Sequence, residues 1–299
     1  EAYRGDVKAA LNDSIALVKY GSHLHGHGLL VEQLVGIAIE ALANKTIFML
    51  LEQLDVPPDV LKNTQQELES QFSKQKTIVS LEAEKAFWYD QIQRTFTDDG
   101  QGHGRMLARG LPYVFTDDWM ENLWRFVSFN YPDRQEMTSK IDEYFRRFAE
   151  IPAETPWDLR DEAIDEQEQN EEVHIAPLML KITIPAYRRV SQIAWRMKTG
   201  RRALLTILAV MRYEKEKAQY PASLDELVAA DYLKELPRDP YSDGPFVYKR
   251  TDEGFLLYSL GTDLTDDGGK LALGKDGKPR MWADDGDWVF WPVAKSQEK

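Results

Sequence analysis

The chain contains no cysteine, and it has fewer basic than acidic residues. The missing thiol excludes disulfide bonds, zinc sites built on thiolates and cysteine nucleophiles. The formal net charge of -13 leaves no clustered positive field for a phosphate backbone, so we expect no nucleic-acid partner. Thiol chemistry and nucleic-acid binding are therefore excluded at the outset.

Long apolar runs are also missing. The longest mostly apolar stretches, such as residues 37–42 and 203–211, fall well short of the roughly 20 residues that span a bilayer. The chain starts at Glu1 and not at a methionine, which suggests a trimmed chain from which a signal peptide or membrane anchor could have been removed. We expect contact with a membrane only through such an anchor.

The sequence does contain enough apolar residues for a core, and over its first half they follow a helical spacing. Hydrophobic residues make up 43% of the 299 residues, and 11% are aromatic. The period of their recurrence is that of an α-helix. It predicts helices over residues 6–20, 29–54, 58–75, 78–95, 117–131 and 132–148. Short connectors between them indicate an array of helical hairpins.

The composition changes over residues 150–172, where ten acidic residues accompany the single Arg160. Such a charge run is typical of a solvated linker or an exposed helix. We place a domain boundary near its end. The predicted domains are a helical array over residues 1–176 and an α+β domain over residues 177–299, so the expected fold class is mainly α with a C-terminal α+β module.

The C-terminal part has the pattern of one long helix followed by a small antiparallel sheet. Helical spacing runs from Pro185 to about Lys217. After a turn, Ser223 and Glu226 have the spacing of a capping box, which predicts a short helix with Ser223 as its N-cap. A turn at 252–254 and the residues around it predict strands at 246–249 and 255–259, and a third strand is predicted at 288–291.

A series of short motifs follows the long helix in a fixed order. They are Tyr-Pro-x-Ser-Leu-x-x-Leu at 220–227, Tyr-Leu at 232–233, Leu-Pro-x-Asp-Pro-Tyr at 236–241, Pro-Phe-x-Tyr at 245–248 and Gly-Phe-x-Leu-Tyr-Ser-Leu-Gly-x-Asp at 254–263. This series is similar to the periplasmic domain of the type II secretion major pseudopilins. The resemblance implies a pseudopilin-like long helix packed on a small antiparallel sheet, and calcium in the loop after the last motif.

In that family the calcium ligands are aspartates from both ends of the loop and a backbone carbonyl near its start. Carried over to this sequence, they imply Leu260, Asp263, Asp266, Asp267, Asp285 and Asp287. This chain departs from the family because about 185 residues precede the long helix. That part, with Gly-Asp-Val-Lys-Ala-Ala-Leu at 5–11 and Gln-Leu-Val-Gly-Ile-Ala at 33–38, resembles uncharacterised bacterial proteins common in planctomycetes.

The acidic loop also indicates calcium from its own spacing. Asp263, Thr265 and Asp267 place oxygens at positions one, three and five of a turn closed by a glycine, as in calcium loops. Gly274 stands where an EF-hand has its bidentate glutamate, so Asp284, Asp285 or Asp287 would have to complete the ligands. Clustered carboxylates repel one another without a cation. The alternative is a solvated acidic surface loop.

Two glycine-rich connectors contain the remaining candidate binding residues. His23, His25 and His27 alternate in the first one and could bind zinc or copper, but the glycines among them favour a surface turn. Residues 100–105 could cradle a phosphate, yet they follow a predicted helix and not a strand, which favours chance. His103 and His174 are expected to be exposed or capping residues.

No set of residues in the sequence predicts catalysis. The aromatic residues Trp119, Trp124, Phe126 and Phe129 could form a carbohydrate platform or a peptide groove, but their helical spacing favours a packed core. We therefore expect a non-enzymatic binding or scaffold protein for a protein or peptide partner, in the periplasm or at the cell surface, where calcium is millimolar. The alternatives are a hydrolase of an envelope polymer with its site in the helical half, and a component of a type II secretion-like apparatus.

Overall fold

The computed structural model describes residues 5–75, 77–107, 132–150, 155–158, 178–271, 273–274, 277 and 280–293. The predicted helix at 117–131, its aromatic residues, and His174 lie outside these residues. The predicted domain boundary at 176 also lies outside them, as does most of the acidic stretch before it.

The first three helices lie close to their predicted positions. They are α1 (Val7–Ser22), α2 (Leu30–Gln53) and α3 (Pro58–Lys74). Helix α1 begins after Asp6, whose side chain accepts a hydrogen bond from the backbone N–H of Ala9. Helix α3 begins with Pro58 in its first turn, where no amide donor is needed. Helix α3 ends at Lys74, where the chain turns toward the next connector.

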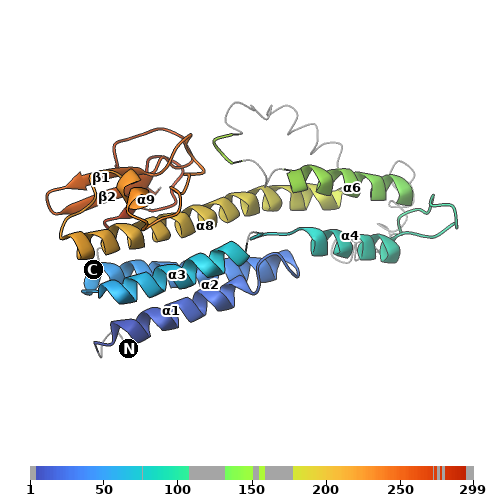
Figure 1. Cartoon of the computed structure of the whole chain (residues 1–299). Helices are drawn as coiled ribbons and strands as arrows, with labels where there is room; N and C mark the ends of the chain where they lie inside the picture. Colours follow the sequence, from blue (N-terminus) through green and yellow to red (C-terminus); the bar gives the residue numbers. More distant parts are fainter. Residues whose placement is uncertain are drawn as a thin grey trace.

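The long helix α8 (Leu178–Lys217) has 40 residues, which makes it about 60 Å long. Its C-terminal half packs along α2 and α3, and α1 packs against both of those helices, so that the four form a bundle (Figure 1). The main core of the described residues contains Leu11 of α1, Ile47 of α2, Leu61 of α3 and Leu204 of α8, all of them buried. The bundle thus unites helices from both predicted domains.

A small sheet packs against the C-terminal half of α8. Strands β1 (Val247–Thr251), β2 (Gly254–Ser259) and β3 (Trp288–Trp291) pair antiparallel in the order β1-β2-β3. Their buried aromatic side chains, including Phe255 and Trp288, belong to the same core as the bundle. The predicted mainly α fold with a small antiparallel β module is confirmed.

The short helix α9 (Asp225–Ala229) starts two residues later than the predicted cap, so the capping box at Ser223 was wrong. The N-cap residue is Leu224, without a capping side chain. Glu226 does reach back over the turn, but its carboxylate accepts the backbone N–H of Ala222 and the hydroxyl of Tyr213. The side chain of Glu226, on which the prediction depended, is therefore held in part by Tyr213 of α8.

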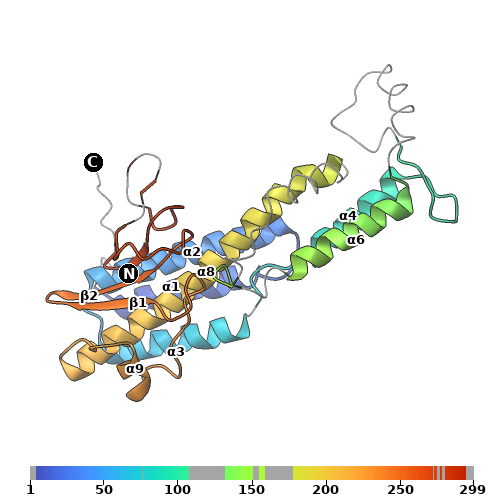
Figure 2. The same ribbon diagram turned by 90° about the horizontal axis from the view of Figure 1, so that it is seen from above.

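Two further helices form an arm at the opposite end of the molecule from the sheet (Figures 1 and 2). Helices α4 (Glu82–Thr95) and α6 (Arg134–Glu150) lie side by side and share a second core. That core also includes Leu30 of α2 and Val190 of α8. Helix α4 begins later than predicted because Ile78 lies in the connector, where it is buried against Ile37 and Met197.

Helix α2 contradicts the expectation that no segment is long and apolar enough to cross a membrane. By length and composition α2 passes that test, although half of its most apolar window is buried in the bundle. The expectation rested on the length of uninterrupted apolar runs. A 24-residue helix with a few isolated charges can still be apolar on average. Its buried face includes three polar side chains, Gln33, Glu40 and Asn44.

Helices α1 and α2 cross at two glycines that touch backbone to backbone. A Cβ atom added to Gly36 would lie 2.6 Å from the carbonyl oxygen of Gly21, and one added to Gly21 would lie 2.6 Å from the carbonyl oxygen of Gly36. Neither backbone can yield without moving a helix. The crossing therefore requires the smallest residue on both sides.

We expect Gly36→Ala to lower the free energy of unfolding by about 1–3 kcal/mol, because the new methyl group overpacks the crossing. Gly200→Ala on α8 is the matched control, since its Cβ would meet nothing closer than 3.8 Å. That variant should be neutral, or more stable by up to about 1 kcal/mol through helix propensity. Urea unfolding of both variants is the measurement, and equal effects at the two glycines would contradict the close crossing.

Candidate functional site

The predicted calcium loop, residues 260–287, leaves β2 and returns to β3, and Asp263 ties its two ends together. One carboxylate oxygen of Asp263 accepts the backbone N–H of Gly286 at 2.8 Å, and the other accepts that of Thr265 at 3.1 Å. The first of these bonds joins residues 23 positions apart. Asp263 thus closes the loop through backbone contacts at its start and its end.

Asp266 is held by the sheet. Its Oδ1 atom accepts the hydroxyl of Tyr258 at 2.8 Å and the backbone N–H of Gly268 at 2.9 Å. The Tyr258 oxygen in turn accepts a hydrogen bond from Lys249 at 2.9 Å. The hydrogen bond from Tyr258 and the nearby charge of Lys249 are among the causes that lower the pKa of Asp266, so this carboxylate is ionised and compensated.

Among the described carboxylates of the loop, Asp287 alone is fully buried. Its Oδ2 atom accepts the backbone N–H of Gly269 at 2.7 Å, whereas its Oδ1 atom is buried without a hydrogen-bond partner. Burial raises the pKa of Asp287, and the charges of Asp266 and Asp267 raise it further. The inner end of the loop therefore contains negative charge and one unsatisfied oxygen, which is the chemistry that a hard cation would satisfy.

The other predicted calcium ligands do not lie together. Asp267 and Asp285 are exposed, and Leu260 lies at the base of the loop. Within the described residues, no group of three or more His, Asp or Glu side chains is placed to hold a metal ion. The donor set fits calcium in type, because all its atoms are oxygens, but the acidic side chains do not converge on one point.

A further buried carboxylate, Asp239, lies beneath the loop and was not among the predicted site residues. Its Oδ1 atom accepts the backbone N–H of Tyr241 at 3.1 Å and the hydroxyl of Ser259 at 2.9 Å, while Oδ2 has no hydrogen-bond partner. Burial raises the pKa of Asp239 to about 6, even though these hydrogen bonds and the charge of Arg202 lower it. The only signal in the sequence was its place in the Leu-Pro-x-Asp-Pro-Tyr motif.

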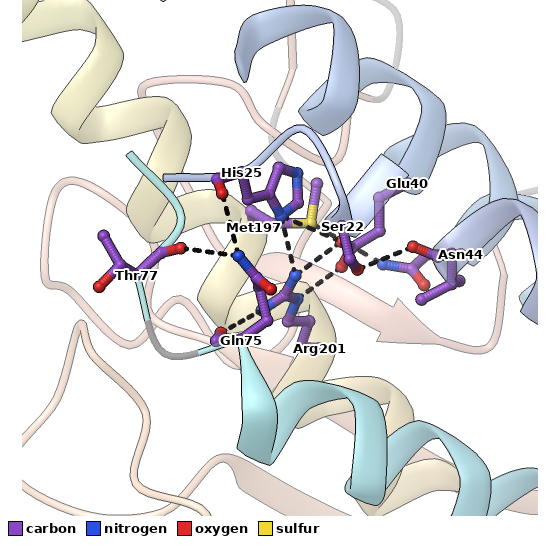
Figure 3. Close-up of polar contacts among 9 residues, drawn as sticks. Ser22, His25, Glu40, Asn44, Gln75, Thr77, Met197 and Arg201 are labelled. Carbon is purple, nitrogen blue, oxygen red and sulfur yellow. Dashed lines mark hydrogen bonds and ion pairs between the residues drawn. The ribbon is translucent and has the colours of Figure 1, made fainter. Parts of the chain in front are cut away.

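The three alternating histidines of the first connector do not converge. His23 and His27 are exposed, but His25 is fully buried, so the predicted surface turn is wrong for this residue. Figure 3 shows the His25 side chain turned inward toward Glu40 and Arg201. Alternation thus separates the imidazoles onto two sides of the chain and leaves His25 in a different, buried cluster.

The centre of this cluster is a bidentate ion pair between α2 and α8. Arg201 donates from Nε to Glu40 Oε1 at 2.5 Å and from a terminal nitrogen to Glu40 Oε2 at 2.6 Å (Figure 3). The Glu40 side chain is completely buried and that of Arg201 nearly so. Ser22 of α1 donates a further hydrogen bond to Glu40 at 3.3 Å, and the guanidinium lies over the ring of Phe72. Planar pairing of this kind compensates the desolvation of both charges.

The ion pair also fixes two connectors. Arg201 donates to the backbone carbonyl of Gln75 at 3.1 Å, and the Gln75 side chain donates to the carbonyl of His25 at 3.1 Å. The same arginine approaches His25 Nδ1 at 3.2 Å. Because Arg201 can only donate, Nδ1 accepts, which assigns the proton of neutral His25 to Nε2, a buried atom without a hydrogen-bond partner. Burial, reinforced by the charge of Arg201, lowers the pKa of His25, although Glu40 opposes the shift.

The buried cluster is suited to holding elements together and not to reacting with a substrate. Its acidic group is fully bonded, and its imidazole is buried and neutral. It joins α1, α2, the connector after α3, and α8. A sequence signal for it existed, because Glu40 is a charge on the inner face of an apolar helix, where an unpaired carboxylate would be very costly.

The second glycine-rich connector, residues 100–105, is bonded to the start of α6 through the carbonyl groups of Gly102 and Gly104. His103 is exposed, as predicted, and its Nδ1 atom lies 2.8 Å from a carboxylate oxygen of Asp133. Asp133 and Glu136 form a reciprocal cap at the start of α6 through each other's backbone N–H groups. The hydrogen bond to Asp133 raises the pKa of His103. These contacts join the connector to α6.

We predict that Arg201→Met lowers the free energy of unfolding by about 3–5 kcal/mol, because it leaves Glu40 buried and unpaired. The double variant Glu40→Leu with Arg201→Met should lose less, since no charge remains in the cluster. Glu67→Gln, which breaks the exposed pair between Lys19 and Glu67, is the control and should cost less than about 1 kcal/mol. Chemical denaturation tests this, and additive losses in the double variant would contradict a coupled pair.

We also predict a pH dependence from Asp239. Its folded-state pKa of about 6 lies above its ordinary value of 3.8, so between these pH values the folded state binds more protons than the unfolded state. Stability contributed by this group therefore falls as pH rises from about 4 to 6, by about 3 kcal/mol at most. Asp239→Asn cannot ionise, so its stability relative to the original chain should improve by that amount between pH 4 and pH 7.

Thermal or urea unfolding across this pH range measures the difference between the two proteins. Ser259→Ala provides a second comparison, because removing this donor should raise the pKa of Asp239 further and move the transition to higher pH. A difference between Asp239→Asn and the original chain that is independent of pH would contradict the raised pKa.

No protein-family model matches this chain, and neither a curated protein nor a solved structure matches it either. Its function must therefore be inferred from the contacts and charges of its own residues.

Proposed function

We propose that this chain is a non-enzymatic binding or scaffold protein that acts outside the cytoplasm and contains a structural calcium ion in loop 260–287. The observation that carries the calcium proposal is the buried, unpartnered Oδ1 atom of Asp287, with the negative charges of Asp266 and Asp267 close to it. A buried oxygen of this kind calls for a cation or a donor. Calcium is the preferred cation because it takes oxygen ligands in flexible geometry.

The ligands proposed are the carbonyl of Leu260 and the carboxylates of the loop, namely Asp263, Asp266, Asp267, Asp285 and Asp287. Because the exposed carboxylates do not converge without the ion, the proposal includes an inward movement of Asp267 and Asp285 on binding. Glycines at 261, 268, 269 and 286 have positive φ angles, so the loop already has the tight turns that bring its ends together. Binding only the native state, the ion would stabilise the fold.

The role as a scaffold is supported by the shape of the molecule. Helix α8 extends for about 60 Å and places the sheet module at one end and the α4–α6 arm at the other (Figure 1). The buried pair of Glu40 and Arg201 fixes α8 to the bundle between them. A rigid spacer with two separate ends suits a protein that presents surfaces to a protein or peptide partner.

A location in the periplasm or at the cell surface follows from the proposed ion. Extracellular modules bind calcium with dissociation constants of about 0.1–1 mM, which cytosolic calcium would leave empty. The pseudopilin-like order of motifs, and the small antiparallel sheet packed on a long helix, support the same assignment.

We expect about 1 mM calcium to raise the melting temperature of the chelator-treated protein by a few degrees, with less effect from magnesium. Asp287→Asn should lose this response, because it removes charge at the buried end of the loop. The matched control is Asp252→Asn in the exposed β1–β2 turn, which should respond like the original chain. Differential scanning calorimetry of the three proteins is the measurement. A melting temperature that calcium does not change would overturn the proposal.

A further inference from the structure

One face of α2 exposes apolar side chains along its whole length. Val31, Val35, Leu42 and Met49 are 64%, 50%, 62% and 40% exposed, respectively, and Ala38 is exposed between them. An outward helix face in water is normally polar, and a helix that is apolar on all sides is normally covered on all sides. The inner face of α2 is covered by α1 and α8, whereas this outer face is open in the described residues.

The spacing of this outer face is that of a coiled-coil seam. The exposed positions follow each other at intervals of four, three, four, three and four residues, with Lys45 as the one charged member. They are Val31, Val35, Ala38, Leu42, Lys45 and Met49, which we call the α2 seam. Intervals of three and four are the pattern by which helices interdigitate side by side over a long contact. The seam is about 27 Å long.

The charges of α2 select the occupant and its direction. Lys45 has no ion-pair partner among the described residues, and Glu32 at the other end of the helix has no cationic partner there. When two copies of α2 pair antiparallel about a two-fold axis between Ala38 and Ile39, Lys45 of each copy faces Glu32 of the other, and Leu42 faces Val35. A parallel pair would instead place Lys45 against Lys45.

We propose that the α2 seam is the interface of a homodimer in which two α2 helices pack antiparallel about an axis between Ala38 and Ile39. The contact is isologous, so the same surface of each copy meets the other and the assembly closes at two copies. The small side chain of Ala38 at the axis lets the two helices approach closely, while Val35 and Leu42 fill the space on either side. The two Lys45–Glu32 pairs at the flanks fix the direction.

A membrane surface is a poorer occupant of the same face. Helices that lie on membranes use basic side chains beside their apolar stripe, and α2 has Lys45 alone, on a chain of net charge -13. Insertion of α2 across a bilayer would separate Glu40 from Arg201, which are buried together on its inner face. A second copy satisfies the outer face without disturbing that pair.

Sedimentation equilibrium of the full chain over a wide concentration range tests the dimer. We expect a monomer–dimer equilibrium, and Leu42→Glu should weaken it at least tenfold while circular dichroism stays unchanged. Phe87→Glu on α4, where the side chain is 45% exposed, is the matched control and should dimerise like the original chain. A monomer at all concentrations, or equal weakening by both variants, would overturn the proposal. If that monomer binds vesicles of neutral lipid through α2, a membrane is the occupant.

Because the chain has no cysteine, single cysteines report the direction of pairing without background. Ala38→Cys should be cross-linked into a dimer by a short bis-maleimide, since its two copies meet at the axis. Met49→Cys should not be, because its two copies would lie roughly 30 Å apart in the antiparallel pair. Cross-linking at both positions would indicate a parallel dimer and would overturn the proposed arrangement, as would no cross-linking at Ala38.

Discussion

The buried ion pair between Glu40 and Arg201 is the constraint on which the arrangement of this molecule depends. An isolated charge in the core would cost several kcal/mol, so both helices must present their charges at the same place and in a planar geometry. That requirement fixes the position of α8 against α2. Through His25 and Gln75 it also fixes the connectors that lead to α2 and α4.

Because of this ion pair, the two halves of α8 have different surroundings. The C-terminal half is anchored by the pair and covered by the bundle and the sheet, which share a single core. The N-terminal half extends toward the α4–α6 arm, where a separate core contains Val190. The sheet and the arm are therefore positioned by one continuous helix.

The two buried carboxylates beneath the sheet differ from Glu40 in how their charge is handled. Glu40 has a bidentate cation, whereas Asp239 and Asp287 each retain one oxygen without a partner. Burial raises the pKa of both, so negative charge is poorly compensated at these two positions. A bound cation at the loop would relieve that cost for Asp287.

The sequence by itself determined the secondary structure, because helical and strand periodicity and capping are local properties. It placed α1, α2 and α3 within a residue or two of their bounds, and β3 at its observed bounds. It also identified the acidic loop, where Asp263 proved to tie the two ends together. It failed at α9, where the N-cap is Leu224 and not Ser223, and where Glu226 also accepts a hydrogen bond from Tyr213 of α8.

Only the tertiary structure decided which polar residues are buried and with what partners. His25 looked like a turn residue because the arginine that it contacts lies 176 positions later in the chain. The depth of Asp239 and Asp287 depends likewise on the packing of the sheet against α8, and the exposure of the α2 seam depends on which faces of α2 the other helices cover. The partners of a buried polar group come from distant segments, so a local pattern such as Glu40 on an apolar helix face can indicate burial but cannot name the partner.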